Sequence, residues 1–364
     1  MAGAKDTAGG GLGAVRGAHA AALPATGTLA LSSSREKLRY IQLLRTIAII
    51  LVVTSHVRDI FPETDVVKSD FVGMLTRHIN LVFTFVAGFL FQHLLGSYRY
   101  PDYLRKKIRN VILPYLIVSI PAILAYYVGF KDFLDLGAPS QVNTNIEYLI
   151  FMILTGTAIA PFWFIPMFAI LYLLAPLFRA IDARPMLYLV IAPLLVVSCF
   201  IGRAPGDTNP LHNALFFAPV YLSGMAVSHF KGQAVPALRR IWPLLILTIF
   251  APLLVEPTNL AGRDALLLLS KMIVCLGLVG AAASMERFVS DRVNILGEIS
   301  FGIFFVHYYI VAVLAILADK NYLPFVQGIP WFLFLIAAVT LASAMIVLVI
   351  KRIAGPYSRR IIGA

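Results

Sequence analysis

The chain has 364 residues, of which 60% are hydrophobic and 13% are charged, and its mean hydropathy is +0.85. Soluble domains carry about 25% charged residues, so this composition excludes a soluble globular protein and is typical of an integral membrane protein. The two cysteines, Cys199 and Cys275, lie in apolar segments and form neither a disulfide framework nor a metal-ligand pattern. The net charge of +12 leaves nucleic acid or an acidic surface open as a partner.

Residues 1–39 are rich in Ala, Gly and Ser and contain no long apolar run. A secretory signal needs about 7–15 consecutive apolar residues before a small-residue cleavage site. The nearest match, A-A-L-P-A-T-G-T-L-A-L, is interrupted by Pro24 and Gly27. We therefore expect a flexible cytoplasmic tail that is retained.

Apolar segments recur along the rest of the chain, and most approach the ~20 residues that cross the bilayer as a helix. They indicate an all-α polytopic membrane protein with about ten transmembrane helices, a membrane domain over 40–352 and a short basic cytoplasmic tail over 353–364. The stretch 146–160 either crosses the membrane or lies in its interface. The ten segments are 40–61, 71–95, 108–129, 162–179, 186–202, 213–230, 241–256, 265–285, 297–318 and 329–350.

The positions of Lys and Arg support this count. With the N-terminus in the cytoplasm, 21 of the 30 fall in inner segments, six in outer loops and three within helices. Cytoplasmic loops are enriched in Lys and Arg, so we expect both termini in the cytoplasm. The excess of Lys and Arg in the inner segments then sets the orientation of the protein in the membrane. Nucleic acid is therefore not expected as a partner.

The first apolar segment carries Arg45 and His56, which are separated by ten mostly apolar residues. Eleven helical residues turn by about 1100°, within roughly 20° of three turns, so both side chains share one face about 16 Å apart. A histidine inside the membrane is a functional candidate. The alternative is a packing histidine bonded to a neighbour, with the arginine reaching the interface.

Further cations are expected at a similar depth. Arg77 and His78 follow the outer start of the second helix, and Lys271 follows that of the eighth. Because a buried Arg or Lys costs about 2.5–3.5 kcal/mol on insertion scales, such a layer indicates a hydrated cavity or an anionic ligand. The alternative is that these side chains extend to the outer interface.

A basic segment, Y-R-Y-P-D-Y-L-R-K-K-I-R-N, precedes the third helix. Arg105, Lys106 and Arg109 in it can bind phosphates. The alternative is an anchor that fixes orientation and contacts anionic lipid.

Two further side chains have a functional and a structural interpretation. His307 lies near mid-bilayer in an aromatic helix, where a histidine more often donates a packing hydrogen bond. Trp163 lies in A-P-F-W-F-I-P-M-F and either lines a cavity or sits in an interfacial belt. Pro161 and Pro166 flank it, so we expect a broken or kinked backbone there.

Several motifs, taken in order, resemble the acyltransferase-3 family of bacterial multi-pass acyltransferases. The resemblance covers about residues 38–352 and includes an arginine and a histidine separated by ten residues. Its motifs are L-L-R-T-I-A-I-I-L-V-V-T-S-H, L-V-F-T-F-V-A-G-F-L-F, R-K-K-I-R-N-V-I-L-P-Y, F-W-F-I-P-M-F-A-I-L-Y, F-F-A-P-V-Y-L-S-G-M and L-G-E-I-S-F-G-I-F-F-V-H.

The resemblance implies an O-acyltransferase of the bacterial inner membrane. It would move an acetyl or succinyl group from cytoplasmic acyl-CoA to a hydroxyl of an extracytoplasmic or lipid-linked polysaccharide, such as an exopolysaccharide, O-antigen or glucan. Acyl-CoA would be a co-substrate, with no permanently bound cofactor and no metal. Membrane lipid, the glycan acceptor and the polysaccharide biosynthesis machinery would be its partners.

By the same resemblance, His56 and Arg45 are catalytic, and the family's paired arginines before the third helix correspond to Lys106 and Arg109. Lys106 lacks the bidentate geometry of arginine. Gln42 stands where the family commonly has an acidic residue, so Arg45 lacks that ion partner.

His56 is therefore expected to act as a general base or as an acyl-accepting nucleophile. Candidates for stabilising the oxyanion or binding the acceptor are Arg77, His78, Lys271, Trp163 and His307. The alternative function is a polysaccharide exporter or a lipid-linked glycan flippase. Transporters usually have repeated halves, and the sequence contains no evident internal repeat.

Overall fold

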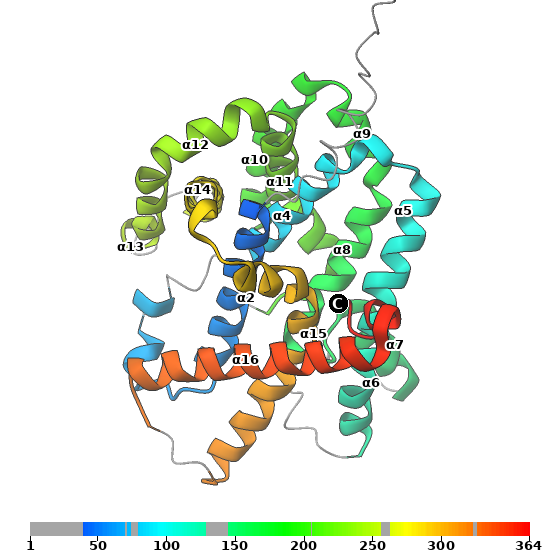
Figure 1. The fold of residues 1–364 in the computed structure, drawn as a ribbon, viewed down its shortest axis with the longest axis vertical. Coiled ribbons are helices and arrows are strands. Elements are labelled where there is room, and N and C mark those ends of the chain that lie inside the picture. Colours follow the sequence, from blue (N-terminus) through cyan, green and yellow to red (C-terminus); the bar gives the residue numbers. More distant parts are fainter. Residues whose placement is uncertain are drawn as a thin grey trace, which may run out of the picture. The chain divides into compact units, whose positions relative to one another are not determined.

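The computed structural model describes residues 39–69, 71–73, 79–128, 145–204, 206–255, 263–322 and 326–364. The predicted tail up to Leu38 lies outside these residues, as do Arg77 and His78. Within them the regular elements are all helical, which confirms the all-α class (Figure 1).

Every apolar segment expected from the sequence coincides with one or more helices. The helices are α2 (Arg39–Arg58), α4 (Ile79–His93), α5 (Tyr100–Lys107), α6 (Leu113–Tyr127), α7 (Asn145–Thr155), α8 (Phe164–Leu173), α9 (Ala175–Asp182), α10 (Ile191–Ile201), α11 (Pro210–His229), α12 (Lys231–Ile246), α13 (Ala251–Val255), α14 (Arg263–Met285), α15 (Asp291–Asp319), α16 (Ile329–Ala354) and α17 (Ser358–Ile361). A π-helical segment, η3 (Ile108–Ile112), joins α5 to α6.

Within the described residues, six helices are long and apolar enough to span a membrane, and two bent pairs raise the number to eight. This confirms a multi-pass membrane protein, with fewer qualifying spans than the ten expected. Two of the expected segments do not qualify. Described α4 has 15 residues, and α11 carries polar side chains such as His212, Asn213 and His229 along its 20 residues.

The expected backbone break around Trp163 is confirmed. Helices Ile146–Thr155 and Ala160–Leu173 are bent by 70° relative to each other. Gly156 adopts φ +77°, and a Cβ there would collide with the carbonyl of Phe162. Glycine is suited to this turn because it has no Cβ. The 146–160 stretch therefore forms a helix and a sharp turn into α8.

Glycines allow three pairs of helices to pack closely. A Cβ on Gly88 of α4 would collide with the Tyr221 carbonyl of α11, and one on Gly280 of α14 would collide with the Leu238 carbonyl of α12. Gly297 of α15 lies in the same way against the Gln42 carbonyl of α2. Small residues at such crossings are typical of membrane helices, whose association depends on close packing.

The contact between α2 and α15 positions the candidate site. Thr46 donates hydrogen bonds to the carbonyls of Gln42, in its own helix, and Val293, in α15. Farther along both helices, the ring of His56 lies beside His307 and Tyr308. The two helices therefore touch near their first turns, at Gln42 and Gly297, and again at the two histidines.

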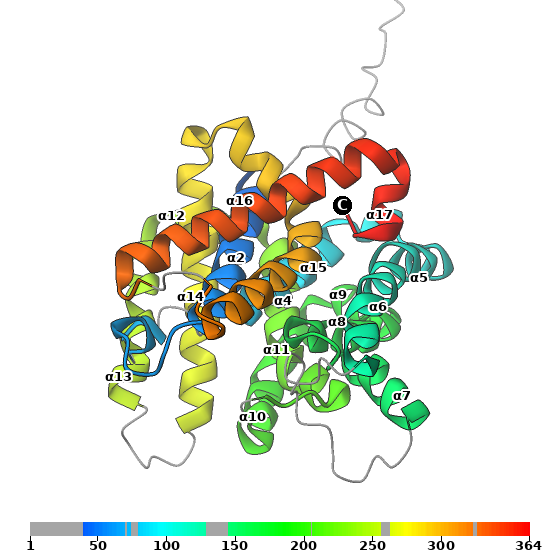
Figure 2. The ribbon, with the colours of Figure 1, turned by 90° about the horizontal axis from the view of Figure 1, so that it is seen from below.

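The chain folds back after α16, which crosses over α2 and α15 (Figure 2). Gly355 ends α16 at φ +52°, and α17 follows. Ile362 and Ala364 are buried, and a Cβ on Gly302 of α15 would lie 2.7 Å from that of Ala364. The segment expected to form a short basic tail thus packs against α15.

Candidate active site

His56 and His307 form a histidine pair between α2 and α15. Their ring centroids are 5.5 Å apart, at an interplanar angle of 41°. Tyr308 packs edge-on against His56, with 5.1 Å between the ring centroids. From the sequence alone, each histidine had a functional and a packing interpretation. The structure brings both rings to one place.

The surroundings of His307 select one tautomer. The side chain is 0% exposed, and Nδ1 lies 3.1 Å and 2.9 Å from the carbonyl oxygens of Ile303 and Phe304. Carbonyl oxygens only accept, so Nδ1 carries the hydrogen and Nε2 keeps a lone pair in the neutral ring. Nε2 is buried and has no hydrogen-bond partner among the described residues. Buried polar atoms are rarely left unpaired, so this nitrogen is a candidate functional group.

His56 is also incompletely bonded. Its Nδ1 is buried without a hydrogen-bond partner among the described residues. The Asp59 carboxylate is 3.7 Å from that nitrogen, which exceeds ordinary hydrogen-bond length. The His56 side chain keeps 19% of its area exposed, so the ring is accessible while His307 is enclosed. The accessible ring is thus the better placed of the two to meet a substrate.

Arg45 has two partners, neither of which was predicted from the sequence. It donates to the side-chain oxygen of Gln42 at 3.3 Å. The carboxylate of Glu298 on α15 also acts electrostatically on the guanidinium. Glu298 follows Gly297, the residue at which α15 approaches Gln42. An acidic residue on α15 therefore supplies the charge that is missing at position 42.

The basic segment of α5 divides into side chains with different surroundings. Arg105 and Lys106 are exposed, whereas Lys107 packs over the rings of Tyr103 and Tyr172 at 5.3 Å and 4.6 Å. Arg109 lies in η3 and lines a cavity of about 550 Å³, which we call the basic pocket. The pocket also contains Lys351, Arg359 and Arg360 from the C-terminal end of the chain. No local sequence pattern links these residues to Arg109.

Two other predicted residues are described. Lys271 is half-buried in α14, a helix that packs against α2. Trp163 is half-buried at the break before α8, where the guanidinium of Arg203 lies 4.3 Å from its ring centroid. Phe217 of α11 stacks on the same indole, with 6.1 Å between ring centroids. Trp163 thus packs mainly against protein groups.

A family model for an acyltransferase domain matches residues 38–349. The chain belongs to the acyltransferase-3 family. No curated protein and no solved structure matches it. The match confirms the family resemblance and establishes a membrane acyltransferase in general terms. It covers α2 and α15, so the histidine pair and Arg45 lie inside the acyltransferase domain.

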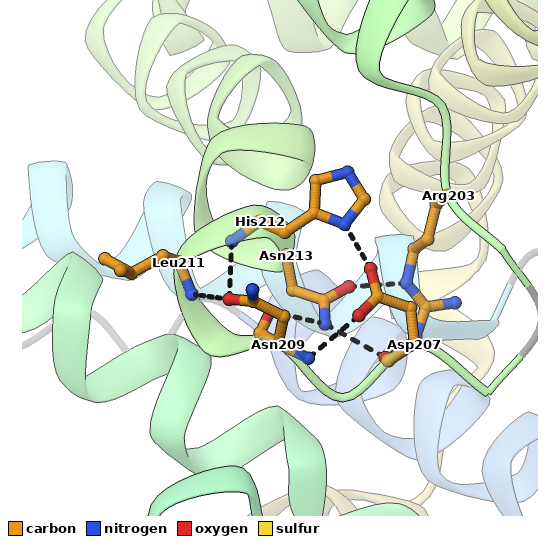
Figure 3. Close-up of polar contacts among 6 residues, drawn as sticks. All are labelled: Arg203, Asp207, Asn209, Leu211, His212 and Asn213. Carbon is orange, nitrogen blue, oxygen red and sulfur yellow. Dashed lines mark hydrogen bonds and ion pairs between the residues drawn. The ribbon is translucent and has the colours of Figure 1, made fainter. Parts of the chain in front are cut away.

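The acyltransferase has a second polar group, which we call the cap cluster, at the start of α11 (Figure 3). Arg203 donates to the Asn213 side-chain oxygen at 2.5 Å and to the Asp207 carbonyl at 3.0 Å. The Asn213 amide donates to the carbonyls of Asp207 and Asn209, and His212 pairs with the Asp207 carboxylate. The Asn209 side chain accepts from two backbone N–H groups at the start of α11.

Electrostatics in the cap cluster follow from these contacts. Burial alone would raise the pKa of Asp207, but the Asn209 N–H, His212 and Arg203 outweigh it and keep the pKa below its ordinary value. Burial lowers the pKa of Arg203, and Asp207 opposes that change. The sequence contained a signal for the helix start, because Asn209 before Pro210 is a typical cap.

Proposed function

We propose that this acyltransferase moves an acetyl or succinyl group from cytoplasmic acyl-CoA to a hydroxyl of an extracytoplasmic or lipid-linked polysaccharide in the bacterial inner membrane. The observation that carries the proposal is the histidine pair, in which an accessible imidazole lies beside a buried one and each has an unpaired nitrogen. Two adjacent rings with unpaired nitrogens suit proton transfer better than packing.

His56 is the general base of the proposed reaction. It takes the proton of the acceptor hydroxyl while that oxygen attacks the thioester carbonyl. When the carbon–sulfur bond breaks, the imidazolium returns the proton to the leaving thiolate, giving an ester and free CoA. In the two-step alternative, the imidazole nitrogen attacks the thioester carbonyl, and the carbon–sulfur bond breaks to release CoA as a thiolate. The acceptor hydroxyl then displaces the imidazole from the acyl-imidazole to form the ester, and its proton neutralises the thiolate.

His307 is proposed as a positioning residue. Its Nδ1–H is held by two helix carbonyls, so its Nε2 offers a hydrogen-bond acceptor to the neighbouring ring. When the His56 ring donates through one nitrogen to this acceptor, its other nitrogen is free to take the proton of the substrate hydroxyl. His307 would thus orient His56 as a carboxylate orients a catalytic histidine, with a neutral acceptor in place of the anion.

Cationic side chains complete the proposal. Arg77, His78 and Lys271 are candidates for stabilising the tetrahedral oxyanion or binding an anionic glycan. Arg109, with Arg105 and Lys106, is proposed to bind the phosphates of acyl-CoA. Arg45, paired with Gln42 and Glu298, would orient the donor between these groups and His56.

The test is transfer of labelled acetyl or succinyl from acyl-CoA to a polysaccharide acceptor by the purified protein in lipid nanodiscs. We expect His56→Ala to lower the rate by about 10²–10⁴-fold, the usual contribution of a general base. His93→Ala is the matched control, because His93 bonds Lys231 in another part of the domain and should leave transfer unchanged. Normal transfer by His56→Ala would overturn the proposal.

A cellular comparison separates this function from transport. In a deletion strain, loss of an ester from a glycan of normal length and amount supports acyl transfer. Loss of the exported glycan itself supports the exporter or flippase alternative. Label that stays on the purified protein when the acceptor is omitted, and is absent in His56→Ala, supports the two-step route.

A further inference from the structure

The basic pocket joins two distant parts of the chain. Its lining combines η3 with the segment that follows α16, and among the described residues it contains four cationic side chains and no carboxylate side chain. They are Arg109, Lys351, Arg359 and Arg360. Four like charges around one cavity repel each other, and an anionic ligand would remove that repulsion.

The backbone holds the C-terminal side of the pocket in place. Gly355 turns the chain out of α16 at φ +52°, and Ser358 donates to the Ala364 carbonyl at 2.6 Å. Gly363 adopts φ +71° beside Phe301 of α15. The guanidinium of Arg360 also lies 5.2 Å from the ring centroid of Tyr357. Tertiary contacts therefore fix the backbone on this side of the pocket, and the four cationic side chains that it carries or faces are exposed.

The opposite side of the pocket is η3, which has π-helical geometry and carries Arg109 and Asn110. Single π-helical turns within α-helices occur frequently at functional sites. The extra residue in such a turn changes the direction of the side chains relative to the preceding helix. This agrees with Arg109 lining the pocket while Arg105 and Lys106 of α5 do not.

Size and charge indicate the kind of ligand. A volume of about 550 Å³ lies within the range of small-molecule sites, which hold roughly 300–1,000 Å³. One phosphate monoester carries about −1.5 to −2 charges, so four cations match a ligand with more than one phosphate group. Arginine binds phosphate oxygens bidentately, and three of the four cations are arginines.

We propose that Lys351, Arg359 and Arg360 complete the donor site by binding, together with Arg109, the phosphates at the nucleotide end of acyl-CoA. This inference rests on the proposed function, and it assigns a substrate-binding role to the segment expected to be a basic tail. Of the three basic residues proposed above to bind acyl-CoA, Arg109 lines the pocket, and Arg105 and Lys106 do not line it.

The position of the pocket relative to the histidine pair supports this assignment. Ala364 lines the pocket and also contacts Gly302 of α15. His307 lies five residues farther along the same helix, or about 8 Å at 1.5 Å per residue. The pocket therefore lies beside the helix that carries His307.

The decisive variant is Arg359→Gln combined with Arg360→Gln, and Arg352→Gln is the matched control. Arg352 is an exposed arginine of α16 that does not line the pocket. We expect the double variant to raise the KM for acyl-CoA by at least about tenfold with little change in kcat, and the control to retain normal values. An unchanged KM in the double variant would overturn the inference.

A direct binding measurement separates failure of this inference from failure of the proposed function. CoA and 3′-dephospho-CoA are titrated onto the full-length protein in nanodiscs of phosphatidylcholine, without an acceptor. Wild type should bind CoA more tightly than 3′-dephospho-CoA, and Lys351→Gln and the double variant should both bind CoA more weakly. Weakened CoA binding without any transfer in wild type would reject the proposed transfer and keep the pocket assignment.

Anionic lipid is the other source of phosphate, and the same variants test it. Nanodiscs that contain phosphatidylglycerol are compared with pure phosphatidylcholine for the thermal midpoint and for CoA affinity. The contrary outcome is that phosphatidylglycerol raises the thermal midpoint of wild type but not that of the double variant, while both proteins bind CoA equally well. In that case the pocket binds lipid headgroups, and the inference is wrong. A similar midpoint of wild type and double variant in phosphatidylcholine shows that the variant folds.

Discussion

The histidine pair and the cap cluster use similar residue types in opposite ways. Each contains a histidine and lies beside aromatic rings. In the cap cluster, Arg203, Asp207 and Asn213 bond one another and the surrounding backbone. In the histidine pair, one nitrogen of each ring is buried without a partner among the described residues.

This difference separates structural polar groups from chemically available ones. A buried polar group without a partner in the protein costs free energy, and a bound substrate or water can offset that cost by supplying the missing bond. A network with satisfied bonds instead fixes a helix end and a loop. We therefore expect substitutions in the histidine pair to impair transfer, and substitutions in the cap cluster to lower stability.

The largest expected effect comes from the histidine pair. His307→Gln should reduce transfer by roughly 10- to 100-fold. It removes the ring nitrogen proposed to accept a hydrogen bond from protonated His56, and a hydrogen bond to a charged group contributes about 1.5–3 kcal/mol. In the His56→Ala background the same change should cost almost nothing, since His307 acts through His56. The four rates of this double-mutant cycle are the measurement, and additive losses would assign His307 a purely structural role.

The contact between α2 and α15, which carry the histidine pair, should also be sensitive to substitution. Gly297→Ala places a Cβ against the Gln42 carbonyl, so α2 and α15 must move apart. We expect a loss of about 1–3 kcal/mol in stability, together with reduced transfer. Gly232→Ala in α12 is the control, because nothing lies within 4 Å of the added Cβ. The control should be neutral or stabilising, since alanine favours helix.

Substitutions in the cap cluster should lower stability and leave catalysis unchanged. Asn213→Ala removes the acceptor of Arg203 and two amide hydrogen bonds. We expect the free energy of unfolding to fall by about 1–3 kcal/mol, while kcat of the folded fraction stays as in wild type. Thermal midpoints and transfer rates of the purified variant provide the test. A kcat loss without destabilisation would place the cluster in the catalytic machinery.

The smallest expected effect is a change in stability at acidic pH. Because the folded state lowers the pKa of Asp207 below 3.8, its carboxylate stabilises the fold above that pH. The stabilisation is lost as pH falls through the lowered folded-state pKa. The midpoint difference between wild type and Asp207→Asn should therefore be constant near neutral pH and shrink below about pH 4. A difference that stays constant to pH 2 would contradict this assignment.

Local patterns in the sequence determined a large part of this protein. Apolar runs of near-membrane length fixed the all-α membrane class, and the prolines around Trp163 located the backbone break. The helical repeat placed Arg45 and His56 on one face, and the ordered motifs identified the family. Hydropathy and helical periodicity depend on neighbouring residues, so the sequence alone carries them.

The tertiary structure decided which distant residues meet. It placed His307 beside His56, Glu298 near Arg45, and the C-terminal cations around Arg109. These contacts depend on how closely and in which register α2, α15 and α16 pack, which Gly297 and Gly302 help to set. The hydropathy of these helices is compatible with many registers between neighbouring helices. Only the packing of their side chains selects one of these registers.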